Sequence, residues 1–259
     1  QARIIEAQLK ETYRVVGARA PELGELKTVR KNKLCSEVGM LKLFTTYFGA
    51  AGIQFAVVMT ADRFTTGFDP DFESYDPLRE YLMYVVEPNL YLQPTNVATR
   101  MQYVQPQYTA NHGLYVRFLA LGDEVQPLSE VRYIPTPDHT ANQDVMDMDL
   151  RINLDEVALE LDLTRSFKGY SGLQIGPIMS LVQEAQRKEI LTELLNHGNE
   201  DATVNDIAFE NDDIAVLHEK PFVFSGKVLA PSMVEKAGPK YLVKIGEAIG
   251  PQVEMYQPE

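Results

Sequence analysis

The sequence contains one cysteine, has few basic residues for its length, and lacks any long apolar run. A single cysteine excludes an internal disulfide framework and a zinc site built from several thiolates. The 24 Lys and Arg residues are outnumbered by 37 Asp and Glu residues, and the formal net charge is -13. This balance argues against partners such as a nucleic-acid backbone or an anionic membrane surface, since binding to either depends on basic side chains. No stretch approaches the roughly 20 apolar residues that a membrane-spanning helix needs.

The composition is otherwise that of a globular protein, with 45% hydrophobic and 24% charged residues, and the length of 259 residues suggests two domains. The chain starts with a helical pattern in which Ile5, Leu9 and Tyr13 recur at helical spacing. It has no initiator methionine. We therefore expect a piece of a longer or processed chain, which is compatible with a removed secretion signal.

Hydrophobic periodicity divides the chain into two domains, over residues 1–105 and 106–259. The first mixes helices with strand-like runs at 53–60, 80–86 and 90–95. The second is rich in strands and is interrupted by one helix at 175–198. Its expected strands are 113–121, 145–154, 156–167, 202–211, 221–230 and 240–249. The predicted fold class is α+β, with a second domain that is β-rich and sandwich-like.

The single cysteine, Cys35, stands at the expected start of a helix. Its apolar stripe consists of Val38, Leu41, Phe44, Tyr47 and Phe48, and Gly49 and Gly52 end it. A helix N-terminus lowers the pKa of a nearby thiol, and a thiolate is a nucleophile. Cys35 is therefore the candidate nucleophile position of this chain, but without a base beside it the favoured interpretation is a vestigial site whose cysteine is a small buried side chain at a helix start.

A cysteine that opens a helix, followed by a strand, a loop, a strand, a hairpin and a strand ending in "LQPT", resembles the core of the bacterial transglutaminase-like proteins of the papain-like group. The sequence "KYLVKIGEAIGPQVEMYQ" (240–257) is similar to the C-terminal region of a subset found mainly in Bacteroidota. In that subset an N-terminal β-sandwich precedes the core and a C-terminal β domain follows it. The resemblance implies a papain-like core with a small antiparallel sheet, and the β-sandwich is missing from this chain. It also implies a periplasmic, outer-membrane-associated or secreted protein.

The family mechanism needs a base beside the thiol and a carboxylate that orients it. The resemblance puts the nucleophile at Cys35, the family His at Glu80 and the family Asp at Gln93. A carboxylate at Glu80 would raise the pKa of a neighbouring thiol, and Gln93 cannot stabilise an imidazolium. His112 is the nearest histidine in the sequence that could replace the base, but the favoured interpretation is a solvent-exposed loop or turn residue before the strand that starts at Gly113.

These substitutions favour a non-catalytic transglutaminase-like module that binds or scaffolds within a larger cell-envelope or secreted protein. The alternative is a cysteine-dependent peptidase or acyl transferase that uses Cys35 with an unconventional base, Glu80 or His112. We expect no cofactor. The expected partner is a protein or peptide, such as the missing N-terminal domain or another envelope protein.

Aromatic residues are frequent in the loop and strands around the presumed cleft. The candidates for binding a peptide or a glycan are Phe68, Tyr75, Tyr81 and Tyr91. The favoured interpretation is that aromatic side chains on alternate strand positions form the core. Acidic residues in the loop 68–76 could hold Ca²⁺, but the EF-hand pattern is missing, and we predict a solvated loop and no metal site.

Overall fold

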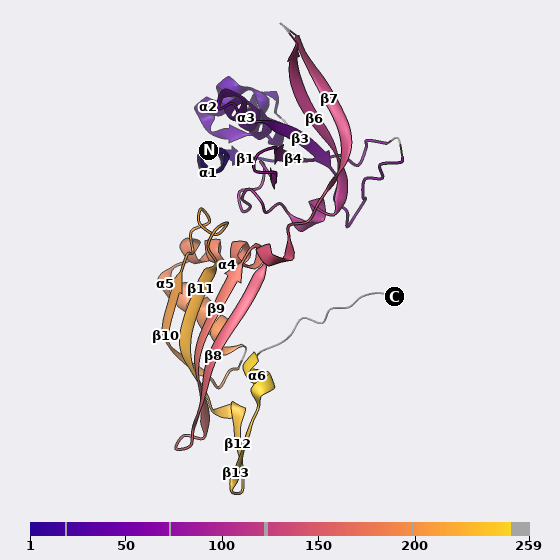
Figure 1. Ribbon diagram of the computed structural model, residues 1–259. Helices are drawn as coiled ribbons and strands as arrows, with labels where there is room; N and C mark the ends of the chain where they lie inside the picture. Colours follow the sequence, from indigo (N-terminus) through magenta and orange to yellow (C-terminus); the bar gives the residue numbers. More distant parts are fainter. Residues whose placement is uncertain (19, 73, 122–123, 198, 250–259) are drawn as a thin grey trace. The chain divides into compact units, whose positions relative to one another are not determined.

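The computed structural model describes all residues except 19, 73, 122–123, 198 and 250–259, and it shows two compact units, Gln1–His139 and Thr140–Glu259 (Figure 1). Helices and antiparallel sheets occur in both units, so the α+β class is confirmed. The division falls after His139, whereas we predicted it after residue 105. Glu73 of the acidic loop and residues 250–257 of the C-terminal sequence lie outside the described residues.

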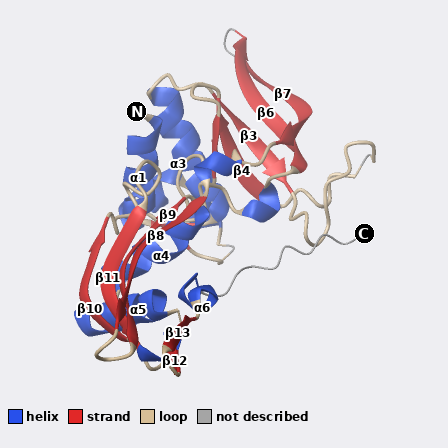
Figure 2. Ribbon diagram, turned by 60° about the horizontal axis from the view of Figure 1, so that its bottom comes forward, coloured by secondary structure: helices blue, strands red, loops and turns tan. Residues whose placement is uncertain are grey.

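In its described residues, the first unit contains three α-helices, a two-stranded sheet and a five-stranded main sheet that ends in a hairpin (Figure 2). Its elements are α1 (Ala2–Thr12), β1 (Arg14–Val15), η1 (Pro21–Gly24), α2 (Leu26–Asn32), β2 (Leu34–Cys35), α3 (Glu37–Ala50), β3 (Phe55–Thr60), β4 (Glu80–Val85), β5 (Leu90–Leu92), η2 (Pro106–Tyr108), β6 (Asn111–Leu121) and β7 (Glu124–Ile134). The main sheet is antiparallel, with the strand order β5-β4-β3-β6-β7, and β1 pairs with β2 in parallel.

The core of the first unit lies between α3 and one face of the main sheet. The buried residues of α3 are Met40, Leu43, Phe44 and Phe48, at spacings of three and four. On β4 they meet Met83 and Val85, while the intervening Leu82 and Tyr84 point to the opposite face and a second cluster. Strand alternation therefore gives β4 two buried faces.

The strands β6 and β7 explain why the boundary was predicted too early. Residues of β6 pair with β3, with Tyr115 opposite Val58, so β6 extends the sheet of the first unit. We predicted no strand at 124–134, and Pro127 in β7 is tolerated because β7 is an edge strand of the sheet. Because β3 and β6 are separated by residues 61–110, their pairing is a long-range feature that local periodicity cannot predict.

The second unit is built on a four-stranded antiparallel sheet with the order β10-β11-β9-β8. Its elements are β8 (Gln143–Asn153), β9 (Ala158–Lys168), α4 (Tyr170–Leu181), α5 (Glu184–Asn196), β10 (Thr203–Glu210), β11 (Phe222–Ala230), η4 (Pro231–Met233), β12 (Val234–Ala237), β13 (Lys240–Val243) and α6 (Ile245–Ile249); η3 (His139–Ala141) spans the division. The single helix predicted at 175–198 is two helices, because Val182 and Gln183 adopt extended backbone angles. The strand predicted at 240–249 is β13 followed by α6.

The sandwich-like arrangement predicted for this unit is wrong for the described residues. Helices rather than a second sheet pack on the strands: α4 contacts β9 and β11, and α5 contacts β10 and β11. Gly226 of β11 marks the helix-covered face, since a side chain there would run into Leu195 of α5. Alternation in the sequence predicts one dry face of a sheet, but it does not reveal whether helices or strands cover it.

Candidate functional site

Cys35 lies before the helix rather than in its first turn. It is the second residue of β2, and the next residue, Ser36, is the N-cap of α3. The Ser36 hydroxyl accepts a hydrogen bond from the backbone N–H of Gly39 at 3.2 Å. The capping oxygen thus occupies a free N–H of the helix that was expected to stabilise a thiolate.

The thiol of Cys35 is buried in the core beneath α3. Its side chain has an exposed fraction of 0%, and it belongs to the cluster that contains Met40 and Val29. The sulfur donates a hydrogen bond to the backbone carbonyl of Arg14, with an Sγ–O distance of 3.6 Å. Burial raises the pKa of the thiol to about 11, because the thiolate loses its hydration. At neutral pH the group is a neutral core side chain.

A glycine beside Cys35 makes this packing possible. A Cβ atom on Gly39 would collide with the carbonyl oxygen of Leu23 and would lie 3.0 Å from the Cβ atom of Cys35. Replacing Gly39 by alanine therefore requires the backbone of η1, which contains Leu23, to move.

We expect Gly39→Ala to lower the free energy of unfolding by about 1–3 kcal/mol, because it overpacks the contact between α3 and η1. Gly49→Ala is the matched control in the same helix: nothing lies within 4 Å of a Cβ there, and we expect a gain of about 0.5–1 kcal/mol. Urea denaturation of both variants measures the difference. Equal stabilities of the two variants would contradict the close packing at Gly39.

Glu80 is the first residue of β4 and is hydrogen-bonded to Tyr108, not to Cys35. Burial is the main cause that raises the pKa of Glu80, and the negative charges of Glu37 and Asp62 raise it further. The same contact and burial raise the pKa of Tyr108 to about 12.

The raised pKa of Glu80 means that the folded state disfavours its carboxylate. Protonated Glu80 therefore contributes to stability. This contribution is complete below the ordinary Glu pKa of 4.5 and is lost as the pH rises through the folded-state pKa. We expect Glu80→Gln to stabilise the protein by a few tenths of a kcal/mol at pH 7, because solvent screens the partly exposed carboxyl group, and to leave it unchanged at pH 4. Thermal unfolding at the two pH values measures this. A variant that is less stable than wild type at pH 7 would show that the carboxylate is favoured.

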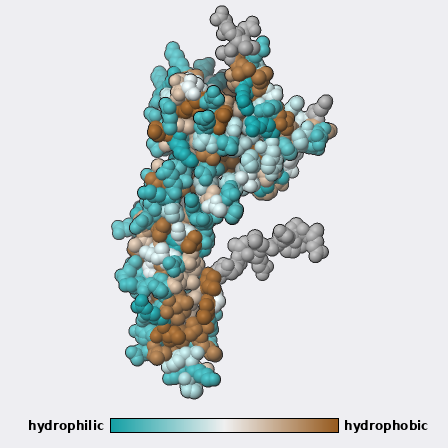
Figure 3. Space-filling model, in the orientation of Figure 1, coloured by the Kyte–Doolittle hydropathy of each residue, from teal (hydrophilic) through white to brown (hydrophobic). Residues whose placement is uncertain are grey.

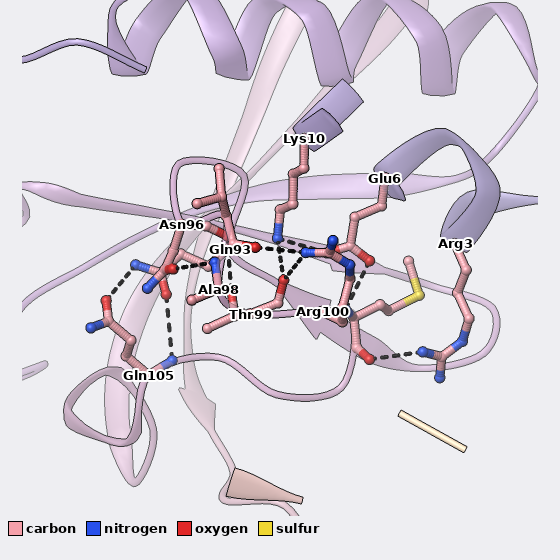
Figure 4. A network of polar contacts seen from close by, with 11 residues as sticks. Arg3, Glu6, Lys10, Gln93, Asn96, Ala98, Thr99, Arg100 and Gln105 are labelled. Carbon is pink, nitrogen blue, oxygen red and sulfur yellow. Dashed lines mark hydrogen bonds and ion pairs between the residues drawn. The ribbon is translucent and has the colours of Figure 1, made fainter. Parts of the chain in front are cut away.

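Gln93 is buried after β5, and its amide is satisfied by a second glutamine (Figure 4). Its Nε2 donates to Oε1 of Gln105 at 2.9 Å, and its Oε1 accepts from the backbone N–H of Gln105 at 3.4 Å. The pair closes the loop between β5 and η2. Gln93 has a structural role in these contacts, and no histidine takes part in them.

His112, the other base considered, lies in β6 opposite Tyr133 of β7. The two rings are 5.4 Å apart in an edge-on arrangement, and the His112 carbonyl accepts a hydrogen bond from the hydroxyl of Thr60. The contacts of His112 are those of a sheet residue, and none of them involves Cys35.

The four candidate aromatic residues do not converge on one groove. Phe68 is buried and packs on Tyr75, whose exposed fraction is 60%. Tyr81 is half-buried. It lies on the same face of β4 as Met83 and Val85, which pack against α3, because side chains alternate between the two faces of a strand. Tyr91 lies opposite Tyr84 on the other side of the sheet, and its hydroxyl is 2.6 Å from that of Tyr115. Tyr81 and Tyr91 are thus separated by the sheet.

A buried ion pair that the sequence analysis missed joins α1 to the segment after β5 (Figure 4). The Nζ atom of Lys10 lies 2.8 Å from Oε1 of Glu6 and 2.8 Å from the carbonyl oxygen of Thr99, and both charged side chains are buried. The other Glu6 oxygen accepts the backbone N–H of Met101. Burial lowers the pKa of Lys10 to about 8 although Glu6 raises it. The sequence contains one indication of this pair. Glu6, Leu9 and Lys10 are spaced three and four residues apart, which places both charged side chains on the apolar face of α1.

Among the described residues, no group of three or more His, Cys, Asp or Glu side chains is placed to hold a metal ion. In the same part of the chain, no helix is long and apolar enough to cross a membrane. No protein-family model, curated protein or solved structure matches the chain.

Proposed function

We propose that this chain is a non-catalytic module of the transglutaminase-like type, which binds or scaffolds as part of a larger protein. The order of elements from α3 through β5 in an antiparallel sheet supports the likeness. The likeness itself rests on the sequence motifs around Cys35 and "LQPT".

The observation that carries the proposal is the state of Cys35. A nucleophilic thiol must be deprotonated and must reach its substrate. The side chain of Cys35 has no exposed surface, its thiol donates a hydrogen bond to a backbone carbonyl, and burial raises its pKa to about 11. A peptidase or acyl transferase that uses Cys35 with Glu80 or His112 would need contacts that neither residue makes.

A protein or peptide partner and a location in the cell envelope or outside the cell are parts of the same proposal. The net charge of -13 supports a protein partner over a nucleic acid. The location follows from the sequence resemblance and remains a prediction.

The test is a comparison of the wild-type chain with Cys35→Ala. The assays follow incorporation of a fluorescent primary amine into a glutamine-containing protein and hydrolysis of unstructured peptides. We expect the two proteins to give the same background rate in both assays. Turnover by the wild type that disappears in Cys35→Ala would overturn the proposal and revive the cysteine enzyme.

A further inference from the structure

The two edges of the sheet in the second unit differ in how well they could accept another strand. On β10 the register breaks between Asn205 and Ala208, and Asp206 between them has a φ of 53°. On β8 all 11 residues stay in unbroken register with β9, without proline or lysine. Natural sheets blunt their edges with bulges, prolines and lysines. By backbone regularity β10 is a protected edge and β8 is an open one, whose charged residues are Asp144, Asp147, Asp149 and Arg151.

From Met146 to Ile152 one face of β8 is apolar and only partly covered, while Asp144 at the start of the same face pairs with Arg165. Its apolar residues are Met146, Met148, Leu150 and Ile152, which lie opposite β9 positions on the helix-covered face of the sheet. The main contacts of α4 and α5 are with β9, β10 and β11. Leu150 is 42% exposed and Ile152 is 45% exposed. Figure 3 shows a concentration of apolar surface on the lower part of the second unit, which contains the end of β8 and α6.

We propose that two copies of this chain associate through β8, antiparallel, with the two-fold axis passing through Leu150. The two four-stranded sheets would then form one continuous sheet, and the apolar faces of the two β8 strands would cover each other's exposed side chains. This proposal concerns the second unit alone and does not rest on the proposed function of the first.

Symmetry restricts the possible registers. Directly opposed residues of an antiparallel pair lie on the same face, so a two-fold axis normal to the sheet has to pass through a residue position. With the axis at Leu150, each Asp149 lies opposite Arg151 of the second copy. On the apolar face, Leu150 meets Leu150 and Met148 meets Ile152. Opposite charges directly across a strand pair stabilise it, and like charges destabilise it.

The neighbouring registers each oppose like charges. An axis at Met148 puts Asp147 against Asp149, and an axis at Asp147 or Asp149 puts that aspartate against itself. An axis at Arg151 puts the arginine against itself. From Asp147 to Arg151, the register at Leu150 is therefore the one that pairs opposite charges without opposing like ones. The charge pattern of β8 is the argument for a second copy as the occupant.

Charge exchange tests the proposal by sedimentation velocity of the full chain at micromolar concentrations. We expect a dimer for the wild type. Asp149→Arg and Arg151→Asp should each weaken it about tenfold or more, because two attractive pairs become two repulsive ones. The double variant D149R/R151D should restore it, because the pairs form again with the charges exchanged. Glu210→Arg makes the same charge change on the opposite edge strand, β10, and should leave the dimer intact.

Cysteine cross-linking tests the register independently of charge. Under mild oxidation, Leu150→Cys should form a covalent dimer, since this residue faces its own copy at a Cβ distance of about 5 Å. Met148→Cys lies on the same strand and face, but its two copies would be four residues, or about 13 Å, apart, and it should not cross-link. A wild-type monomer, a dimer that ignores the Asp149 and Arg151 changes, or equal cross-linking of both cysteines would overturn the proposal. A monomer would point to another protein or another segment as the cover of β8.

Discussion

Iodoacetamide should label Cys35 of the folded protein at pH 7 at most about one-hundredth as fast as it labels the unfolded chain. The thiolate is the reacting species, and each pKa unit changes its fraction tenfold. The rise of the Cys35 pKa from 9.0 to about 11 therefore accounts for a factor of about 100, and the absence of exposed surface on the side chain slows the reaction further.

The dependence of the labelling rate on pH distinguishes a buried thiol from an activated thiolate more clearly than the rate at a single pH. In the folded protein we expect the rate to keep rising up to about pH 11, whereas an activated thiolate would reach its plateau below pH 7. The control is Leu34→Cys combined with Cys35→Ala, because Leu34 precedes Cys35 in β2 and is 41% exposed. This shifted thiol should react close to the unfolded rate. A plateau below pH 7 for the wild type would contradict the buried structural thiol and with it the non-catalytic proposal.

Lys10→Met should lower the free energy of unfolding at pH 7 by about 3–5 kcal/mol. The substitution leaves the buried Glu6 carboxylate without the ammonium group that pairs with it, and removing one partner of a buried ion pair is costly even with Arg100 close by. Glu6→Gln combined with Lys10→Met should recover most of this loss, since Gln keeps an oxygen for the Met101 N–H and carries no charge. Guanidinium denaturation of the single and double variants forms a double-mutant cycle. Additive losses would show that the two side chains do not act as a pair.

The pH dependence of stability has a definite sign at the same site. The pKa of Lys10 is about 8 in the folded protein and near 10.5 in the unfolded chain, so the unfolded state binds more protons between these values. Stability therefore rises with pH from about 8 to 10.5 through Lys10. Cys35 acts in the opposite direction above pH 9, because its folded-state pKa is raised. The variant Lys10→Met lacks this titrating group. The difference in unfolding free energy between wild type and Lys10→Met should therefore grow as the pH increases from 8 to 10.

Local spacing was sufficient to predict most strands of the second unit. In β9, Leu159, Leu161 and Leu163 are buried and alternate with exposed Glu160 and Asp162, and a period of two has no other simple interpretation. The α+β class, the helix after Cys35 and the order of β3, β4 and β5 also followed from periodicity and turn residues. These features depend on residues close together in the chain.

The buried face of α3 could not be predicted in the same way. The expected stripe included Val38, which is 46% exposed, while Met40 and Leu43, outside the stripe, are fully buried. Apolar residues occur on several sides of this helix, so helical spacing alone does not choose the side that meets the sheet.

The chemistry at Cys35 depended on long-range packing. Its residue type and its place before a helix indicated a nucleophile, but the thiol is neutral because Arg14, Val29 and Met40 surround it. The partners of Glu80 and Gln93, Tyr108 and Gln105, come from a segment that also had no local signal. Residue types and their spacing thus specified most of the elements that form and the groups that are available. Desolvation and hydrogen bonding by distant segments specified their charge, and these effects exist only once the chain has folded.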